Sequence, residues 1–211
     1  MTIVSIKAGA TEDVRRIALS DGSCFSFNIS YLPPIIDENR YSPGIEGLAI
    51  TQAEEEAFRF ASACLRAEKA ALQLITRAEQ TVFGLSRKLE KRGHDTACAR
   101  AVITRLCETG LLDDHRYARL WLESRLSCLQ GKAQQTASPR RLLAALRARV
   151  ERHAAETALK EALDDETEQQ LLEGFMQKQS RTKSLDRSAL RYQLKGEGFS
   201  SFAIQRYFDN S

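Results

Sequence analysis

The chain has 211 residues, of which 43% are hydrophobic and 28% are charged, with 11 Gly and 4 Pro. This composition is typical of a globular protein and excludes fibrous and disordered classes. Charge is uneven: residues 1–60 hold 5 Lys and Arg against 9 Asp and Glu (net −4), residues 61–150 hold 17 against 8 (net +9), and residues 151–211 hold 9 against 11 (net −2). The basic middle favours an anionic partner, either nucleic acid or an acidic protein surface. The alternative is that the basic side chains only solvate exposed helix faces, which gives the same excess of positive charge.

The sequence shows no signal for a membrane, a disulfide framework or a metal site. No segment approaches the roughly 18 consecutive apolar residues of a membrane span, and the first residues do not resemble a secretory signal, so we expect a cytoplasmic protein. The five cysteines form no C-x-x-C pair, and the histidines at 94, 115 and 153 are not at i, i+4 spacing. We therefore expect neither a metal nor any other cofactor.

A small β-rich element with a Pro-rich connector is predicted for residues 1–50. The runs TIVSIKA, VRRIALS and SCFSFNI alternate in part between apolar and polar residues, and the SDGS between the last two is typical of a hairpin turn. Three of the four prolines then fall in YLPPIIDENRYSPG, which indicates a connector. So small a sheet is not stable alone, and we expect it to pack on the residues that follow.

Helices are predicted from Thr51 onward, because Ala, Leu, Glu, Arg and Lys dominate and only Pro139 interrupts them. Thr51 and Glu54 have the spacing of a capping box, in which each side chain bonds the other residue's backbone N–H. This places one helix start at Thr51.

Three similar segments follow, beginning at residues 85, 142 and 190. Each is expected to form two short amphipathic helices with a break at or near glycine, with Ala97, Ala101 and Val102 of the first copy facing inward. A longer helix precedes each copy, over residues 63–77 and after the LDD at Asp113 and at Asp164. The aligned positions are Leu85, Leu142 and Leu190, then Leu89, Leu146 and Leu194, then Gly93, Val150 and Gly198.

These repeats predict a mainly α chain of tandem three-helix units that form an elongated, curved array. The expected divisions are the β-rich element at 1–50, repeat 1 at 51–112, repeat 2 at 113–163 and repeat 3 at 164–211. Units of this kind bury their apolar faces against their neighbours.

The stretch GLLDDHRYA at 110–118 could hold a catalytic acid pair or could begin a helix. Adjacent helical residues point about 100° apart, so Asp113 and Asp114 are poorly placed to act together on one substrate. As a helix start every residue has a role: Gly110 ends the preceding helix, Asp113 caps the next, and Leu112 with Tyr117 has the spacing of a hydrophobic staple. We therefore expect no enzymatic activity. The expected inward face is Tyr117, Leu120, Trp121 and Ser124, with Leu122 and Leu126 beside it.

The same stretch resembles the most recognisable motif of the RecX family of recombinase regulators, through Gly110, Leu112, Asp113, Asp114, Tyr117 and Ala118. The segments RAEQTVFGLSRKL, SPRRLLAALRARV and LRYQLKGEGFSSFAI also resemble parts of the family's three repeats, so the resemblance covers about residues 65–211. The chain departs from the family pattern at Gly84, at Val150 where glycine is usual, and in a longer connector at 130–138.

The resemblance implies a small all-helical modulator of DNA repair and the SOS response, and the acidic, polar faces of the terminal repeats predict a monomer. It implies binding to the RecA recombinase filament on DNA, with single-stranded DNA reached through the filament, and inhibition of ATP hydrolysis, strand exchange and coprotease activity. No cofactor is implied.

Two basic clusters are the candidate partner- or DNA-binding residues. The alternatives are that these residues only solvate helix faces, or that the chain is a helical transcriptional regulator that binds duplex DNA. The candidates are Arg87, Lys88, Lys91 and Arg92 in the first repeat, and Arg140, Arg141, Arg147 and Arg149 in the second.

Overall fold

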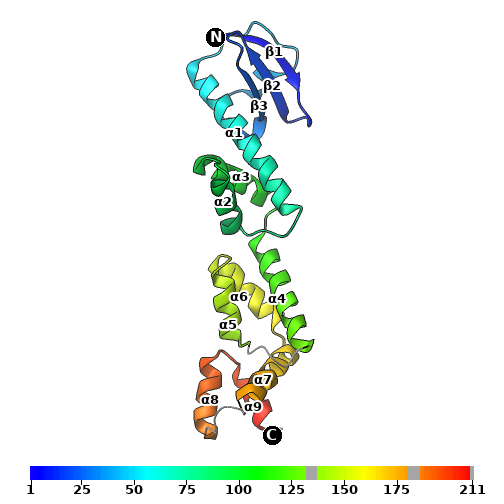
Figure 1. Cartoon of the computed structure of the whole chain (residues 1–211), viewed down its shortest axis with the longest axis vertical. Helices are drawn as coiled ribbons and strands as arrows, with labels where there is room; N and C mark the ends of the chain where they lie inside the picture. Colours follow the sequence, from blue (N-terminus) through cyan, green and yellow to red (C-terminus); the bar gives the residue numbers. More distant parts are fainter. Residues whose placement is uncertain (132–136, 180–185, 210–211) are drawn as a thin grey trace. The chain divides into compact units, whose positions relative to one another are not determined.

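The structure is a computed structural model that describes residues 1–131, 137–179 and 186–209. It is mainly helical with a small antiparallel sheet at the N-terminus, as the sequence predicts (Figure 1). The chain divides into two compact units, residues 1–112 and residues 113–211. Residues 132–136 of the predicted long connector lie outside the described residues. The division into three repeats and their elongated, curved arrangement stay predictions.

The first unit begins with a three-stranded sheet in the order β1 (Ile3–Ala8), β2 (Val14–Leu19) and β3 (Cys24–Asn28). Both strand pairs are antiparallel, and the predicted hairpin turn is present between β2 and β3, where Gly22 has a φ of +88°. Two short 3₁₀ helices follow, η1 (Ile29–Tyr31) and η2 (Glu38–Tyr41). Each strand buries at least one large apolar side chain, Ile3 and Ile6 in β1, Ile17 and Leu19 in β2 and Phe27 in β3, and these side chains belong to the apolar core of the first unit.

One long helix, α1 (Gln52–Ile75), joins the sheet to the first helical repeat. It packs against β3 near its start and against α2 (Val82–Lys91) and α3 (Thr96–Glu108) further along. The Phe58 ring of α1 stacks on the Phe27 ring of β3, with 5.1 Å between the ring centroids. It also packs edge-on against the Tyr41 ring, with a centroid distance of 5.0 Å. A single apolar core therefore runs from the sheet to α3.

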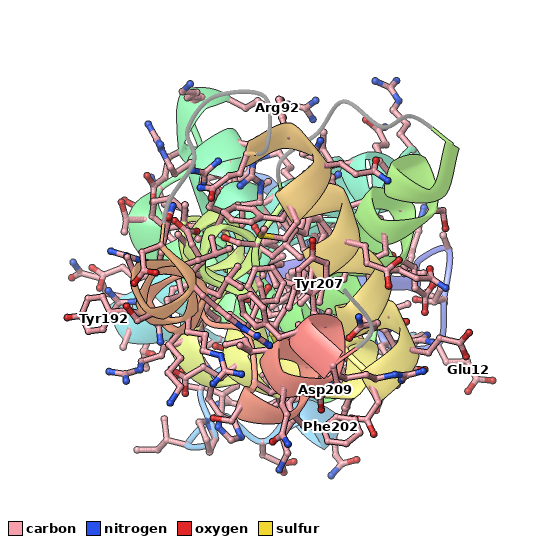
Figure 2. The ribbon with its side chains drawn as sticks, turned by 90° about the horizontal axis from the view of Figure 1, so that it is seen from below. Glu12, Arg92, Tyr192, Phe202, Tyr207 and Asp209 are labelled. Carbon is pink, nitrogen blue, oxygen red and sulfur yellow. The ribbon has the colours of Figure 1, made fainter. Side chains whose placement is uncertain are left out.

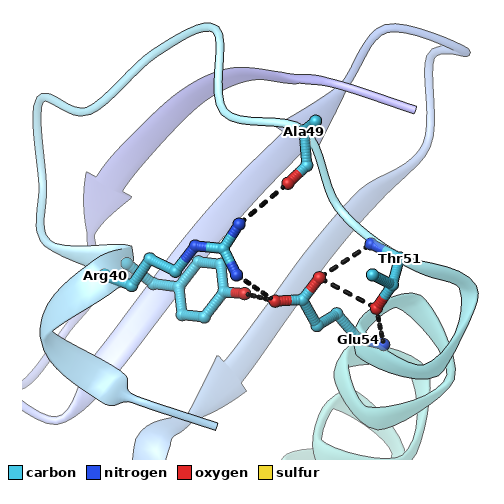
Figure 3. A network of polar contacts seen from close by, with 5 residues as sticks. Arg40, Ala49, Thr51 and Glu54 are labelled. Carbon is cyan, nitrogen blue, oxygen red and sulfur yellow. Dashed lines mark hydrogen bonds and ion pairs between the residues drawn. The ribbon is translucent and has the colours of Figure 1, made fainter.

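The start of α1 is fixed by a network around Glu54 (Figure 3). The capping box is confirmed: Thr51 N donates to Glu54 Oε2 at 2.7 Å, and Glu54 N donates to Thr51 Oγ1 at 3.2 Å. The other carboxylate oxygen accepts from the Tyr41 hydroxyl at 2.5 Å and from Arg40 Nη1 at 2.6 Å. The Pro-rich connector is thereby bonded to the first turn of the helix that it precedes.

The predicted inward face of the first repeat needs one correction. Val102 is buried and Ala101 half-buried, as expected, but Ala97 is exposed, and Cys98 and Ala99 are buried instead. Helix α3 begins at Thr96 after its N-cap Asp95, so residue 97 lies in the first turn on the solvent side.

The second unit contains six helices within its described residues. Helix α4 packs on α6, α5 on α6, α7 on α9, and α8 on α9. Their bounds are α4 (Asp114–Gly131), α5 (Pro139–Arg147), α6 (Arg152–Ala162), α7 (Asp165–Gln179), α8 (Arg187–Gly196) and α9 (Ser201–Asp209).

The turn between α2 and α3 and the turn between α8 and α9 each pass through a left-handed glycine. Gly93 has a φ of +82° and Gly198 a φ of +90°. In both, the N–H after the glycine reaches back five residues: His94 N donates to Leu89 O at 3.2 Å, and Phe199 N donates to Leu194 O at 3.2 Å. This is the longer bond of a Schellman motif, which suits glycine because it needs no Cβ.

The turn between α5 and α6 lacks this glycine position, so the alignment of Val150 with the two glycines is wrong. Val150 N reaches back only four residues, to Leu146 O at 3.0 Å, and Val150 does not have a positive φ. Its side chain is buried, as is that of Phe199. Val150 therefore occupies the position after the missing glycine, and the turn is one residue shorter.

Candidate functional site

The LDD motif acts as a helix start at both of its occurrences. Gly110 has a φ of +70° just after α3, and Asp113 caps α4 by accepting from His115 N at 2.8 Å and Arg116 N at 3.1 Å. Asp164 caps α7 in the same way, accepting from Thr167 N at 2.7 Å. These are the bonds expected of an N-cap carboxylate.

The other motif residues supply packing. Ala118 is fully buried and Tyr117 packs against the core of the second unit, whereas Leu112 is buried in the core of the first. The predicted staple between Leu112 and Tyr117 stays a prediction.

The predicted inward face of α4 is partly wrong. Ala118 and Leu122 are the buried pair, with Tyr117, Trp121 and Leu126 partly buried beside them. Leu120 is 41% exposed and Ser124 is also exposed. The helix packs on α6, and small Ala118 allows a close approach there, so the face is centred about one residue position away from the expected one.

Four predicted binding residues lie on or just after α2, and we call Arg87, Lys88, Lys91 and Arg92 the α2 basic surface. The Arg87 guanidinium lies 5.6 Å from the Phe83 ring centroid, and Lys88 Nζ donates to Gln80 Oε1 at 2.6 Å. Lys91 and Arg92 are exposed at the helix end. Among the residues that the structure describes, none of the four forms an ion pair with a carboxylate, so this surface keeps its positive charge.

The second cluster consists of Arg140, Arg141, Arg147 and Arg149, which we call the α5 basic group. Arg140 Nη1 donates to Gly196 O at 3.3 Å, and Arg141 Nε lies 3.7 Å from Glu197 Oε2. Both contacts join α5 to the turn between α8 and α9. These two arginines therefore hold the second unit together as well as carrying charge.

Arg147 is paired with an acid of α6, Glu156, which it shares with Arg152. Arg147 and Arg152 both donate a hydrogen bond to Glu156 Oε1. The distance from Arg152 Nε to this oxygen is 2.8 Å. The hydrogen bonds from Arg152 and then Arg147 hold the pKa of Glu156 below its usual value, so this carboxylate stays ionised. The α5 basic group therefore carries less net charge than its sequence suggests.

Sequence reasoning did not identify the cation–π cluster around Trp121. The guanidinium of Arg125 lies 5.2 Å from the Trp121 ring centroid, and that of Arg149 lies 5.4 Å from it. The i, i+4 spacing of Trp121 and Arg125 is a signal that the sequence contains, whereas Arg149 comes from the end of another helix.

The described residues also bear on metal binding and on membrane insertion. They contain no cluster of three or more His, Cys, Asp or Glu side chains that could hold a metal ion. Among these residues there is also no helix with both the length and the hydropathy needed to cross a membrane.

Comparison with known proteins identifies the family. The chain is 31% identical to regulatory protein RecX of Treponema pallidum (strain Nichols) over 161 residues, which cover 76% of this chain and 94% of that protein. The chain belongs to the RecX family. The RecX protein of Mycobacterium sp. (strain JLS) is 32% identical over 147 residues, covering 60% of this chain and 80% of the relative.

Further RecX matches cover different shares of the chain. The RecX protein of Halorhodospira halophila is 38% identical over 96 residues, so the chain matches only about half, 53%, of that relative. A crystal structure of a regulatory protein RecX superposes with a TM-score of 0.64 at 18% identity, covering 99% of this chain and 98% of the other. The crystal structure of RecX from Lactobacillus salivarius superposes with a TM-score of 0.54 at 19% identity, covering 71% of this chain and 97% of the other. No family model matches the chain.

The motif residues that first indicated RecX are thus explained by the fold. The eight predicted binding residues lie on two surfaces of different character, and their binding role stays a prediction.

Proposed function

We propose that this protein binds the RecA recombinase filament on DNA and inhibits its ATPase, strand-exchange and coprotease activities. The observation that carries the proposal is membership of the RecX family of regulatory proteins, through relatives that the chain matches over most of their length. The protein acts by binding, and it occupies the filament as a monomer in the cytoplasm.

The α2 basic surface is the better candidate for the filament contact. Its four cations lie within one short helix and its end, and none is paired with a described carboxylate. The α5 basic group is less suited, because Glu156 and Glu197 already partner two of its members. Uncompensated cations attract DNA phosphates or acidic protein surfaces and make the affinity depend on salt.

The test is ATP hydrolysis by RecA–single-stranded-DNA filaments with increasing amounts of the purified full chain. We expect the hydrolysis rate to fall as the protein saturates the filament. An unchanged rate at a several-fold excess of the protein contradicts the proposal.

A charge-reversed pair then tests the surface. Lys91→Glu with Arg92→Glu should weaken inhibition and its salt dependence, because two attractive charges become repulsive. The matched control is Arg66→Glu with Lys69→Glu, an equal charge change at two exposed positions of α1 in the same unit. Equal losses in both pairs would mean that only net charge matters, and the α2 basic surface would be rejected as the contact.

Sequence-specific binding to duplex DNA without recombinase is the signature of the alternative, a transcriptional regulator. Discrimination of about 10³ or more over random duplex would favour that function instead.

A further inference from the structure

An exposed aromatic side chain borders an open hollow between α8 and α9. Tyr192 is 83% exposed, and Figure 2 shows its ring projecting away from the α8 ribbon. The hollow has a volume of about 520 Å³ and is lined chiefly by Arg191, Tyr192, Lys195, Ile204, Gln205 and Asp209. None of these residues belongs to the basic clusters that the sequence indicated.

The exposure of Tyr192 is not explained by packing within the unit. Leu194, two residues further along α8, is fully buried, so Tyr192 lies on the opposite, solvent side of the helix. A large aromatic ring left in water contributes nothing to the core, but it offers a flat face on which another ring can stack.

Cations flank this ring and keep much of their charge. Lys195 and Arg191 form no ion pair with any residue in the described part of the chain, and the Arg191 guanidinium rests 5.0 Å from the Phe208 ring centroid. Asp209 is the single carboxylate among the described lining residues. Two positive charges against one negative charge favour an anionic ligand here.

An exposed aromatic ring beside unpaired cations is the arrangement by which proteins bind single-stranded nucleic acid, with bases stacked on the ring and phosphates on the cations. Duplex DNA fits less well, because its bases are already stacked on one another. An acidic peptide would use the cations but would have less use for an open ring face.

We propose that the hollow between α8 and α9 binds single-stranded DNA directly, with a base stacked on Tyr192 and the adjoining phosphates contacted by Arg191 and Lys195. This goes beyond the proposed function, because it requires no recombinase. Gln205, on the opposite wall, supplies an amide that can bond the polar edge of the base.

The test is fluorescence anisotropy of a fluorescein-labelled oligothymidylate titrated with the full chain in the absence of recombinase. Tyr192→Ala should weaken binding by about 5- to 100-fold, the range for loss of one base–aromatic stack. Tyr192→Phe keeps the ring and should bind as the wild type does. Lys195→Gln should lower the slope of log affinity against log salt by about 0.7, the value for one phosphate contact on a single strand.

The matched control is Phe202→Ala, which removes another exposed aromatic ring of the same unit, 58% exposed on α9, that does not line the hollow. It should leave the affinity unchanged. Circular dichroism checks that every variant keeps its helix content.

Any of the following results would overturn the inference: no binding by the wild type, equal affinity of Tyr192→Ala and wild type, or an equal loss in Phe202→Ala. A Tyr192→Ala variant that loses recombinase binding but not oligonucleotide binding also overturns it, since the hollow would then contact protein. Failure here leaves the inhibition of filament ATP hydrolysis to be judged by its own assay.

Discussion

Replacing Glu197 by alanine should destabilise the second unit, because this side chain holds the α8–α9 turn against the start of α5. Ser138, the fully buried N-cap of α5, donates its hydroxyl to Glu197 Oε2 at 2.5 Å. Arg141 Nε lies 3.7 Å from the same oxygen, and the Glu197 side chain is 19% exposed. The turn and α5 are also joined by Arg140 N donating to Glu197 O at 2.9 Å, a bond that alanine keeps.

The expected loss is about 1–3 kcal/mol of unfolding free energy, because alanine leaves the buried Ser138 hydroxyl without its acceptor. The ion pair with Arg141, whose side chain is largely exposed, contributes less, at most about 1 kcal/mol. Glu197→Gln keeps an acceptor for the hydroxyl and removes the charge, so its loss should be the smaller of the two.

Urea unfolding followed by tryptophan fluorescence measures this loss, since the only tryptophan, Trp121, lies in the second unit. The control is Glu151→Ala, an exposed acid at the N-cap of α6 whose side chain makes no capping hydrogen bond. If the unfolding free energy of Glu197→Ala lies within about 0.5 kcal/mol of the wild-type value, as for a neutral surface change, Glu197 does not hold the α8–α9 turn against α5 in the way assigned.

Three further predictions concern local structure. Asp113→Ala should cost about 0.5–2 kcal/mol as a lost cap and Asp113→Asn much less, measured by urea unfolding; a large functional loss at unchanged stability would contradict the capping role. Gly198→Ala should lower the melting temperature more than Gly93→Ala does. Both positions need a left-handed φ, but only at Gly198 would a Cβ lie close to the α5 backbone, 3.2 Å from Arg140 N. Equal decreases would show that this close approach costs nothing. Burial alone would raise the pKa of Glu54, but the hydrogen bonds that its carboxylate accepts hold the pKa below the usual value in the folded protein. The ionised carboxylate therefore stabilises the fold above about pH 4.3, the pKa of an unfolded Glu. This stabilisation is lost as the pH falls through the lower folded-state pKa. Glu54→Gln should flatten that loss in acid titrations followed by circular dichroism, and an unchanged acid profile would refute it.

Helix starts could be predicted from the sequence because their chemistry is local. The capping box joins Thr51 to Glu54, and Asp113 bonds the backbone two and three residues away. The residue types and spacings that make these bonds are visible in the sequence. The glycine turns at Gly93 and Gly198 were predictable for the same reason, since glycine is favoured where φ is positive.

The errors arose where a second element decides the outcome. The apolar residues of α4 allow more than one inward face, and contact with α6 selects the one that contains Ala118 rather than Leu120. An ungapped alignment cannot distinguish a turn in which valine replaces glycine from a turn in which the glycine is missing and Val150 is the residue after it. Only the backbone bond to Leu146 distinguishes them.

The sequence shows which charged residues the candidate surfaces contain, but it does not show which of those charges are paired with an opposite charge in the fold. Arg141 meets Glu197, an acid 56 positions away, and Arg147 meets Glu156 on the next helix. Neither pairing follows from a local pattern. For the same reason the hollow beside Tyr192 was not apparent, because α9 supplies its second wall.

The shared core of the first unit has a consequence for shortened forms of the protein. Phe58 of α1 is covered by Phe27 and Tyr41, both of which come from the first 50 residues. A chain that began at Thr51 would expose this ring, lose the Tyr41 and Arg40 bonds to Glu54, and leave the first turns of α1 without their apolar cover. Residues 1–50 therefore complete the apolar core around α1, α2 and α3, and a protease that cut within the connector would weaken that core rather than release a separate domain.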